Sequence, residues 1–70
     1  MTTKQKIKMA MIQGGGRGTQ RELATVLEIS APSVVNKLKG EQEFKVPEIR
    51  KFAKRYGLTA EQICDIFIWR

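Results

Sequence analysis

The chain has 70 residues, 41% of them apolar, and a formal net charge of +6, which predicts one small domain spanning residues 1–70. It contains one cysteine and no histidine, so we expect no disulfide framework, no metal site and no other cofactor. It has neither an apolar run near the roughly 20 residues of a transmembrane helix nor an N-terminal signal core. We therefore expect a cytoplasmic protein that does not bind membranes.

The first predicted element is a short helix over about Lys4–Gln13, because Ile7, Ala10 and Met11 share one helical face. The sequence GGGRG at residues 14–18 ends it, since consecutive glycines lose too much backbone entropy to stay helical. No strand precedes this segment and the G-x-x-x-x-G-K-[ST] pattern is absent. The segment is therefore predicted to be a flexible connection and not a nucleotide-binding loop.

The segment TQRELATVLEISAPSVVNKLKG, residues 19–40, predicts two short helices separated by a tight turn. Thr19 followed by Glu22 has the pattern of a capping box, in which each side chain bonds the other residue's backbone amide. The apolar face of this helix comprises Leu23, Ala24 and Leu27.

The second helix of this segment is expected over residues 31–39. Ser30 can cap it, and Pro32 fits its first turn, where a missing amide hydrogen costs nothing. Gly40 is a helix stop. Two helices this short with so few residues between them indicate a helix-turn-helix, whose second helix lies in the DNA major groove.

A fourth helix is predicted from Pro47 to the stop at Gly57. Its apolar stripe comprises Ile49, Phe52, Ala53 and Tyr56. Its opposite face carries Arg50, Lys51, Lys54 and Arg55. Phe44, in the charged connection at residues 41–45, is expected to pack beneath that connection.

A fifth helix begins after Thr59, which forms a capping box with Gln62, while Leu58 and Ile63 fit a hydrophobic staple. Ile63, Ile66 and Phe67 are expected to face inward. Cys64 is interpreted as a small core residue.

The elements together predict an all-α fold, a compact bundle of about five short helices that contains a helix-turn-helix. No period-2 run, internal repeat or linker is present. Ile68 and Trp69 lie beyond the apolar stripe of the last helix. They are either a lid on the core or a surface for self-association, for instance as a homodimer on DNA.

The positive charge is concentrated in the first part of the chain. Residues 1–40 carry seven Lys and Arg against two Glu, whereas residues 41–70 have a net charge of only +1. The half that contains the helix-turn-helix is thus the basic half, as in proteins that neutralise DNA phosphates. Basic domains also bind acidic proteins or membrane surfaces, and many charged faces are simply solvated.

The ordered segments TQREL, PSVVNKLKG and GLTAEQI resemble the lambda-repressor/Cro-type (XRE) helix-turn-helix family. The resemblance runs from about Ile7 to Phe67 and is closest to short phage-encoded transcriptional regulators. It implies a lambda-repressor-like DNA-binding domain in which Ala24 lies where the two motif helices cross. It also implies that Ile29 and Val34 fix the turn and the second helix to the core.

The same resemblance implies which residues contact DNA. The positions that match the base-reading face are Ser30, Ala31, Ser33, Val35, Asn36 and Lys39. Phosphate contacts are expected from Thr19, Gln20, Arg21 and Lys37.

Two departures from the family pattern have physical consequences. Glu28 occupies the turn position where the family favours glycine, so a strained left-handed backbone is expected there. The base-reading face lacks arginine, the usual reader of guanine, although Asn36 can pair with adenine and Val35 or Ala31 can touch a thymine methyl. Specificity is therefore expected to depend partly on DNA shape, water or lysine contacts.

The sequence favours a repressor-like transcription regulator that binds an operator on double-stranded DNA and acts by occupying it. The alternative is a protein-interaction module of the same fold, antitoxin-like or anti-repressor-like, with an acidic protein partner. An enzyme is the weakest reading, because no histidine, serine–base pair or metal cluster is present for acid–base chemistry. We accordingly expect no small-molecule substrate.

Overall fold

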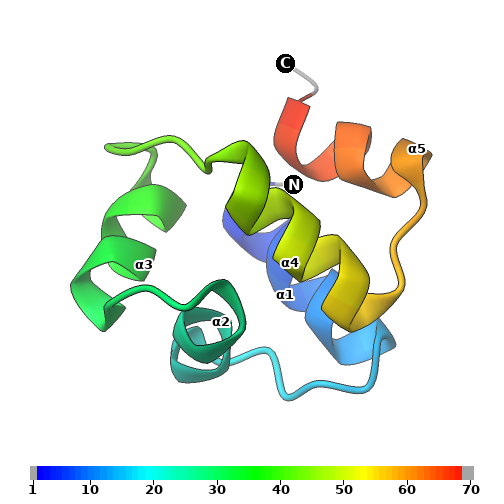
Figure 1. Ribbon diagram of the computed structural model, residues 1–70, viewed down its shortest axis with the longest axis horizontal. Coiled ribbons are helices and arrows are strands. Elements are labelled where there is room, and N and C mark those ends of the chain that lie inside the picture. The colour runs from blue at the N-terminus through cyan, green and yellow to red at the C-terminus, as the bar shows by residue number, and fades with distance from the viewer. Residues whose placement is uncertain (1, 69–70) are drawn as a thin grey trace.

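A computed structural model describes residues 2–68 of the chain and the side chains of residues 2–67 (Figure 1). This part of the chain contains five helices and no strand, which confirms the all-α bundle. The helices are α1 (Thr3–Gln13), α2 (Gln20–Leu27), α3 (Ala31–Lys39), α4 (Val46–Tyr56) and α5 (Ala60–Ile63), and α5 continues directly into a wider π-helical segment, η1 (Cys64–Ile68).

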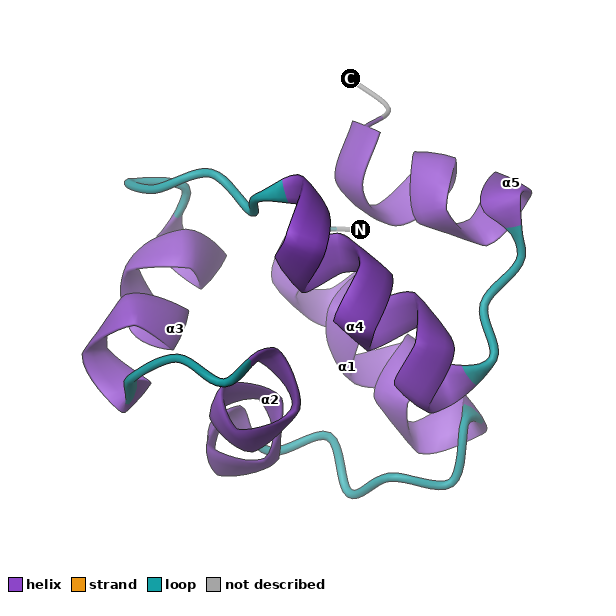
Figure 2. Cartoon of the chain, in the orientation of Figure 1, coloured by secondary structure: helices purple, strands orange, loops and turns teal. Residues whose placement is uncertain are grey.

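The central pair of helices is α1 and α4, with α2 and α3 on one side and α5 with η1 on the other (Figure 1). α2 packs against both α3 and α4, and η1 packs against α1. In Figure 2, α2 is seen nearly end-on while α3 lies across the view, so the two helices run in different directions. The turn between them is formed by the three residues Glu28–Ser30.

The core is built from the apolar stripes that the sequence predicts. Its buried members are Ile7, Ala10, Met11, Leu23, Leu27, Val34, Phe52, Tyr56 and Ile66. Phe67 contacts Phe52 edge-on, with ring centroids 5.5 Å apart, and Phe44 contacts Phe67 in the same manner at 5.1 Å. The prediction that Phe44 packs beneath its connection is therefore confirmed.

The helix ends follow local capping rules, with two differences from prediction. α1 begins at Thr3, earlier than predicted, because Thr2 and Gln5 form a capping box. α4 begins at Val46, so Pro47 is its second residue and not its first. The capping box of Thr59 with Gln62 is present as predicted.

Cys64 was expected in the core, and this prediction is wrong: its thiol-bearing side chain is exposed. The reason is the helical phase, since Ile66 is buried and Ile63 and Phe67 are half-buried on the inner face of this helix. Residue 64 follows Ile63 by about 100° of rotation and falls on the outer face.

Candidate nucleic-acid interface

The turn between α2 and α3 has the strained backbone that the sequence predicts. Glu28 adopts φ 58° and ψ 44°, the left-handed conformation that ends α2. Its carboxylate pairs with Lys51 of α4, which lowers the pKa of Glu28. Ala24 and Ile29 are partly buried against the core on either side of the turn. These contacts hold the turn in place although no glycine occupies it.

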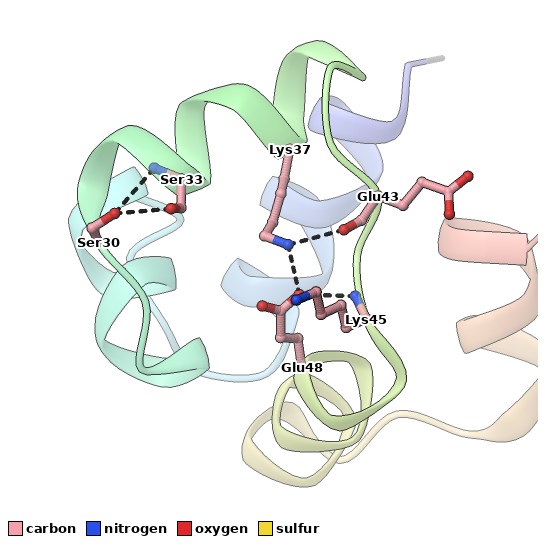
Figure 3. Close-up of polar contacts among 6 residues, drawn as sticks. All are labelled: Ser30, Ser33, Lys37, Glu43, Lys45 and Glu48. Carbon is pink, nitrogen blue, oxygen red and sulfur yellow. Dashed lines mark hydrogen bonds and ion pairs between the residues drawn. The ribbon is translucent and has the colours of Figure 1, made fainter.

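The start of α3 is fixed by Ser30, whose hydroxyl accepts a hydrogen bond from the Ser33 amide at 3.3 Å. The two serine hydroxyls are 2.9 Å apart (Figure 3). Ser30 and Ala31 are exposed, as is Lys39 at the other end of α3. Ser33, Val35 and Asn36 are half-buried. Every predicted base-contact residue thus retains accessible surface.

Asn36 lies in the middle of this surface. Its backbone carbonyl accepts hydrogen bonds from the amides of Glu41 and Gln42 beyond the end of α3. Its side-chain amide makes no hydrogen bond to any residue between positions 2 and 67. Both its donor and its acceptor therefore remain available to a base edge.

Lys37 differs from its predicted role as a phosphate contact, because its side chain is only 5% exposed. Its Nζ lies 2.9 Å from Oε1 of Glu48 in α4 and donates to the carbonyl of Glu43 at 2.9 Å (Figure 3). The same ammonium lies 5.9 Å from the centroid of the Phe44 ring. An ammonium held in this way is turned away from solvent, so the expectation of a phosphate contact at Lys37 is wrong.

The carboxylate of Glu48 has a second bond, from the backbone amide of Lys45 at 2.8 Å. Burial alone raises the pKa of Glu48, but the Lys45 amide, the Lys37 ammonium and the charge of Lys45 outweigh it and lower that pKa. Glu48 is therefore a charged partner for Lys37, and its Oε1 accepts both bonds.

The start of α2 carries the expected phosphate contacts Thr19, Gln20 and Arg21, all of them exposed. Thr19 caps the helix, its hydroxyl accepting from the Glu22 amide at 3.1 Å. The predicted return bond of a capping box is absent from α2: the Glu22 carboxylate accepts from the Arg17 amide at 2.7 Å and from the Tyr56 hydroxyl. Glu22 thus joins α2 to α4 and to the glycine-rich segment.

The glycine-rich segment is packed against Tyr56, contrary to the prediction of a flexible connection. A Cβ on Gly14 would lie 2.8 Å from the Tyr56 Cβ, and one on Gly16 would lie 2.9 Å from Cε1 of the same ring. The hydrogen bond from Tyr56 lowers the pKa of Glu22, while burial and this carboxylate raise the pKa of Tyr56. These glycines are therefore required by the close approach.

Two basic residues of α1, Lys4 and Lys8, lie beside the start of α2, and sequence reasoning did not select them. Both line a depression of about 170 Å³ together with Thr19, Gln20 and Leu38, and no acidic residue lines it. Lys4 also lines a second hollow, of about 730 Å³, whose other cations are Lys37 and Lys39 and whose one carboxylate is Glu43. The spacing of four between Lys4 and Lys8, which puts both on one face of α1, is the sequence signal that could have indicated them.

The predicted self-association pair falls outside the described part of the chain, Trp69 entirely and Ile68 in its side chain. Within residues 2–68, no helix is long and apolar enough to cross a membrane.

The geometry defines a small all-α domain built around a helix-turn-helix with basic residues beside it. The family model described as BetR domain matches residues 3–67, nearly the whole chain. The chain therefore belongs to the BetR domain family and is a small helical regulatory domain. No curated protein and no solved structure matches it significantly.

Proposed function

We propose that this BetR domain is a sequence-specific DNA-binding transcription regulator, of the repressor kind found among lambda-repressor/Cro-type proteins, that acts by occupying an operator. The observation that carries the proposal is the surface of α3, a short helix that follows a three-residue turn and on which the side chains of Asn36 and Lys39 have no bonded partner among the described residues. α3 lies in the major groove. Its base contacts come from Ser30, Ala31, Ser33, Val35, Asn36 and Lys39.

Phosphate contacts come from the start of α2 and from α1. Thr19, Gln20 and Arg21 are exposed at the first turn of α2, where amide dipoles already favour an anion. Lys4 and Lys8 flank the same place, since they line one depression with Thr19 and Gln20. They replace Lys37, whose charge is neutralised by Glu48.

Sequence reading on this surface depends on few groups. Asn36 is the one accessible side chain of α3 with both a donor and an acceptor in an amide, the arrangement that pairs with adenine. Val35 and Ala31 can contact thymine methyl groups. Preference for A·T pairs and for a deformable site follows from this set of side chains.

The proposal implies no enzymatic activity, cofactor or small-molecule substrate, and places the regulator with DNA in the cytoplasm. Two-fold-related half-sites would be bound by a homodimer, for which Ile68 and Trp69 are the candidate contacts.

A second candidate function is binding to an acidic protein, which the outer face of α4 favours. Arg50 and Lys54 lie one turn apart there, both exposed and without a bonded partner among the described residues. Arg50 gains no stabilising partner at this spacing, whereas Lys54, in the last turn of α4, also complements the helix dipole.

The decisive experiment is selection from a random genomic DNA library at two salt concentrations, followed by sequencing of the bound DNA. Three proteins are compared: the wild type, Asn36→Ala/Lys39→Ala on α3, and Arg50→Gln/Lys54→Gln on α4. We expect the wild type and the α4 variant to enrich the same short site, and the α3 variant to lose it.

Enrichment of no sequence by the wild type would contradict the proposed function. Salt-sensitive binding without enrichment would then indicate a non-specific role. No DNA binding at either salt concentration, together with capture of an acidic partner that the α4 variant fails to bind, would establish the second candidate.

A further inference from the structure

The recognition helix α3 is attached to the rest of the domain in two different ways. One side packs on α2 and α1 through apolar contacts, with Val34 completely buried. The same side, one turn further along α3, reaches α4 through the ion pair of Lys37 with Glu48, whose side chains are 5% and 11% exposed. Figure 3 shows these two side chains pointing toward one another from the two helices.

The ion pair is a directional contact. Lys37 donates to Oε1 of Glu48 and to the carbonyl of Glu43, each at 2.9 Å. Glu48 is itself held by the Lys45 amide. One ammonium is thus bonded to the first turn of α4 and to the connection that precedes it. Hydrogen bonds weaken steeply when misaligned, whereas apolar contacts tolerate sliding and rotation.

Stability alone is a poor reason for this pair, because the cost of desolvating two buried charges often exceeds their attraction. Apolar side chains of similar volume often stabilise a protein as well or better. The property that a buried ion pair adds is a defined relative orientation of the two helices that carry it.

That geometry controls where the base-reading residues point. Successive residues of an α-helix are separated by about 100° of rotation, so the inward direction of Lys37 sets the directions of its neighbours. Asn36 precedes Lys37 by one position and Lys39 follows it by two. A rotation of α3 about its axis that displaced Lys37 would move both of them relative to a base edge.

We propose that Lys37 and Glu48 are positioning residues that fix the rotation of α3 and thereby determine how sharply the protein discriminates between DNA sequences. The inference rests on the proposed function, since discrimination exists only if α3 reads DNA. Neither residue touches DNA. Removing the pair changes the ratio of specific to non-specific affinity and not the number of phosphates neutralised.

The test replaces both charges at once, in Lys37→Met/Glu48→Gln. Methionine preserves most of the lysine stem, and the glutamine amide oxygen can still accept from the Lys45 amide, so the start of α4 retains its cap. The matched control is Lys6→Met/Asp65→Asn, which removes an ion pair between α1 and η1 without changing net charge. Circular dichroism melts establish a temperature at which all three proteins are folded.

At that temperature, affinity is measured for the site that the wild type enriches and for a scrambled duplex of the same composition. We expect the affinity ratio to fall about tenfold or more in Lys37→Met/Glu48→Gln, the equivalent of losing roughly one base contact. We expect an unchanged salt slope in that variant and an unchanged ratio in the control.

An unchanged ratio in Lys37→Met/Glu48→Gln would overturn the inference while leaving the proposed function intact. An equal fall in the control would overturn it as well, because the effect would then follow from any lost ion pair. A wild type with no preferred sequence would refute the proposed function itself, and the inference with it.

Hydrogen exchange of the α3 amides in the two variants supplies a readout without DNA. We expect a greater loss of protection in Lys37→Met/Glu48→Gln than in the control, and equal protection in the two variants would contradict the positioning role.

Discussion

At the scale of single residues, neighbouring side chains of α3 differ in whether they can read a base, neutralise a phosphate or do neither. Asn36 has an unpaired amide and no formal charge, Lys39 is an exposed cation, and Lys37 is a cation whose charge is neutralised inside the protein. The three are neighbours in sequence but differ in what they can offer a duplex. Each therefore has a different signature in a binding titration.

Asn36→Ala removes the one amide on this surface that can form two hydrogen bonds with a base. We expect a loss of about 1–3 kcal/mol at a single base pair of the preferred site and little change on random DNA. Competition titrations with single-base variants of the site measure this. An equal loss on every sequence would show that Asn36 does not read a base.

Arg21→Ala removes an exposed cation at the start of α2. We expect affinity to fall on all sequences and the slope of log K against log salt to decrease by about one. Lys54→Ala, on the outer face of α4, is the control and leaves the slope unchanged. A slope that Arg21→Ala does not alter would exclude Arg21 from the phosphate contacts.

At the scale of elements, the glycine-rich segment and α2 are joined to the end of α4 by one carboxylate. Glu22 accepts from the Arg17 amide and from the Tyr56 hydroxyl, and Gly16 has no room for a side chain beside them. The position of α2, and with it the expected phosphate contacts, therefore depends on a segment that contains no apolar side chain.

Gly16→Ala places a methyl group against the Glu22 carboxylate, the Tyr56 ring and the carbonyl of Met11. We expect the free energy of unfolding to fall by about 1–3 kcal/mol, the usual cost of overpacking. Gln13→Ala, at the exposed last residue of α1, is the control and changes it by less than about 0.5 kcal/mol. Chemical denaturation followed by circular dichroism gives both values. Equal stability of the two variants would show that position 16 can accommodate a side chain beside Glu22 and Tyr56.

Local patterns predicted most of the elements, because caps and apolar periodicity act over a few residues. Ser30, Thr59 and the stripe ending at Tyr56 behave as the sequence indicates. The strain at Glu28 was also predictable, since it follows from backbone sterics at one position.

Two of the errors arise where a side chain has a choice of partners distant in sequence. Glu22 bonds Tyr56, 34 residues away, in place of its own helix start. Lys37 lies three residues after the buried Val34, a spacing that indicates an inner face, but its partner Glu48 belongs to another helix. Periodicity predicts which face is inside and does not predict that a charge is accommodated there.

At the scale of the whole molecule, a small number of contacts between ionisable side chains connect the helices. These contacts make the free energy of unfolding depend on pH. The pKa values of Glu22 and Glu48 are lowered in the folded protein by their hydrogen-bond partners, and burial raises the pKa of Tyr56. Carboxylates with lowered pKa stabilise the fold above the unfolded value of 4.5 and lose this effect as pH falls below it. A tyrosine with a raised pKa stabilises the fold below its unfolded value of 10.0 and loses this effect as pH rises above it.

We therefore expect thermal stability to be greatest between these two limits and to decline on both the acid and the alkaline side. Melting curves recorded from about pH 3 to about pH 11 measure the profile. Tyr56→Phe should flatten the alkaline decline and leave the Glu48 contribution to the acid decline in place. An unchanged alkaline decline in that variant would assign the effect to another group.

The exposed thiol of Cys64 has a practical use. It is the only cysteine in the chain, and η1, which carries it, lies on the other side of the α1–α4 pair from α3 (Figure 1). A maleimide dye therefore attaches at one known point without any engineered mutation. Energy transfer from that dye to a fluorophore at one end or the other of a short duplex would report which end of the site the η1 side of the bound protein faces. A palindromic site occupied by two molecules would give equal transfer to a fluorophore at either end.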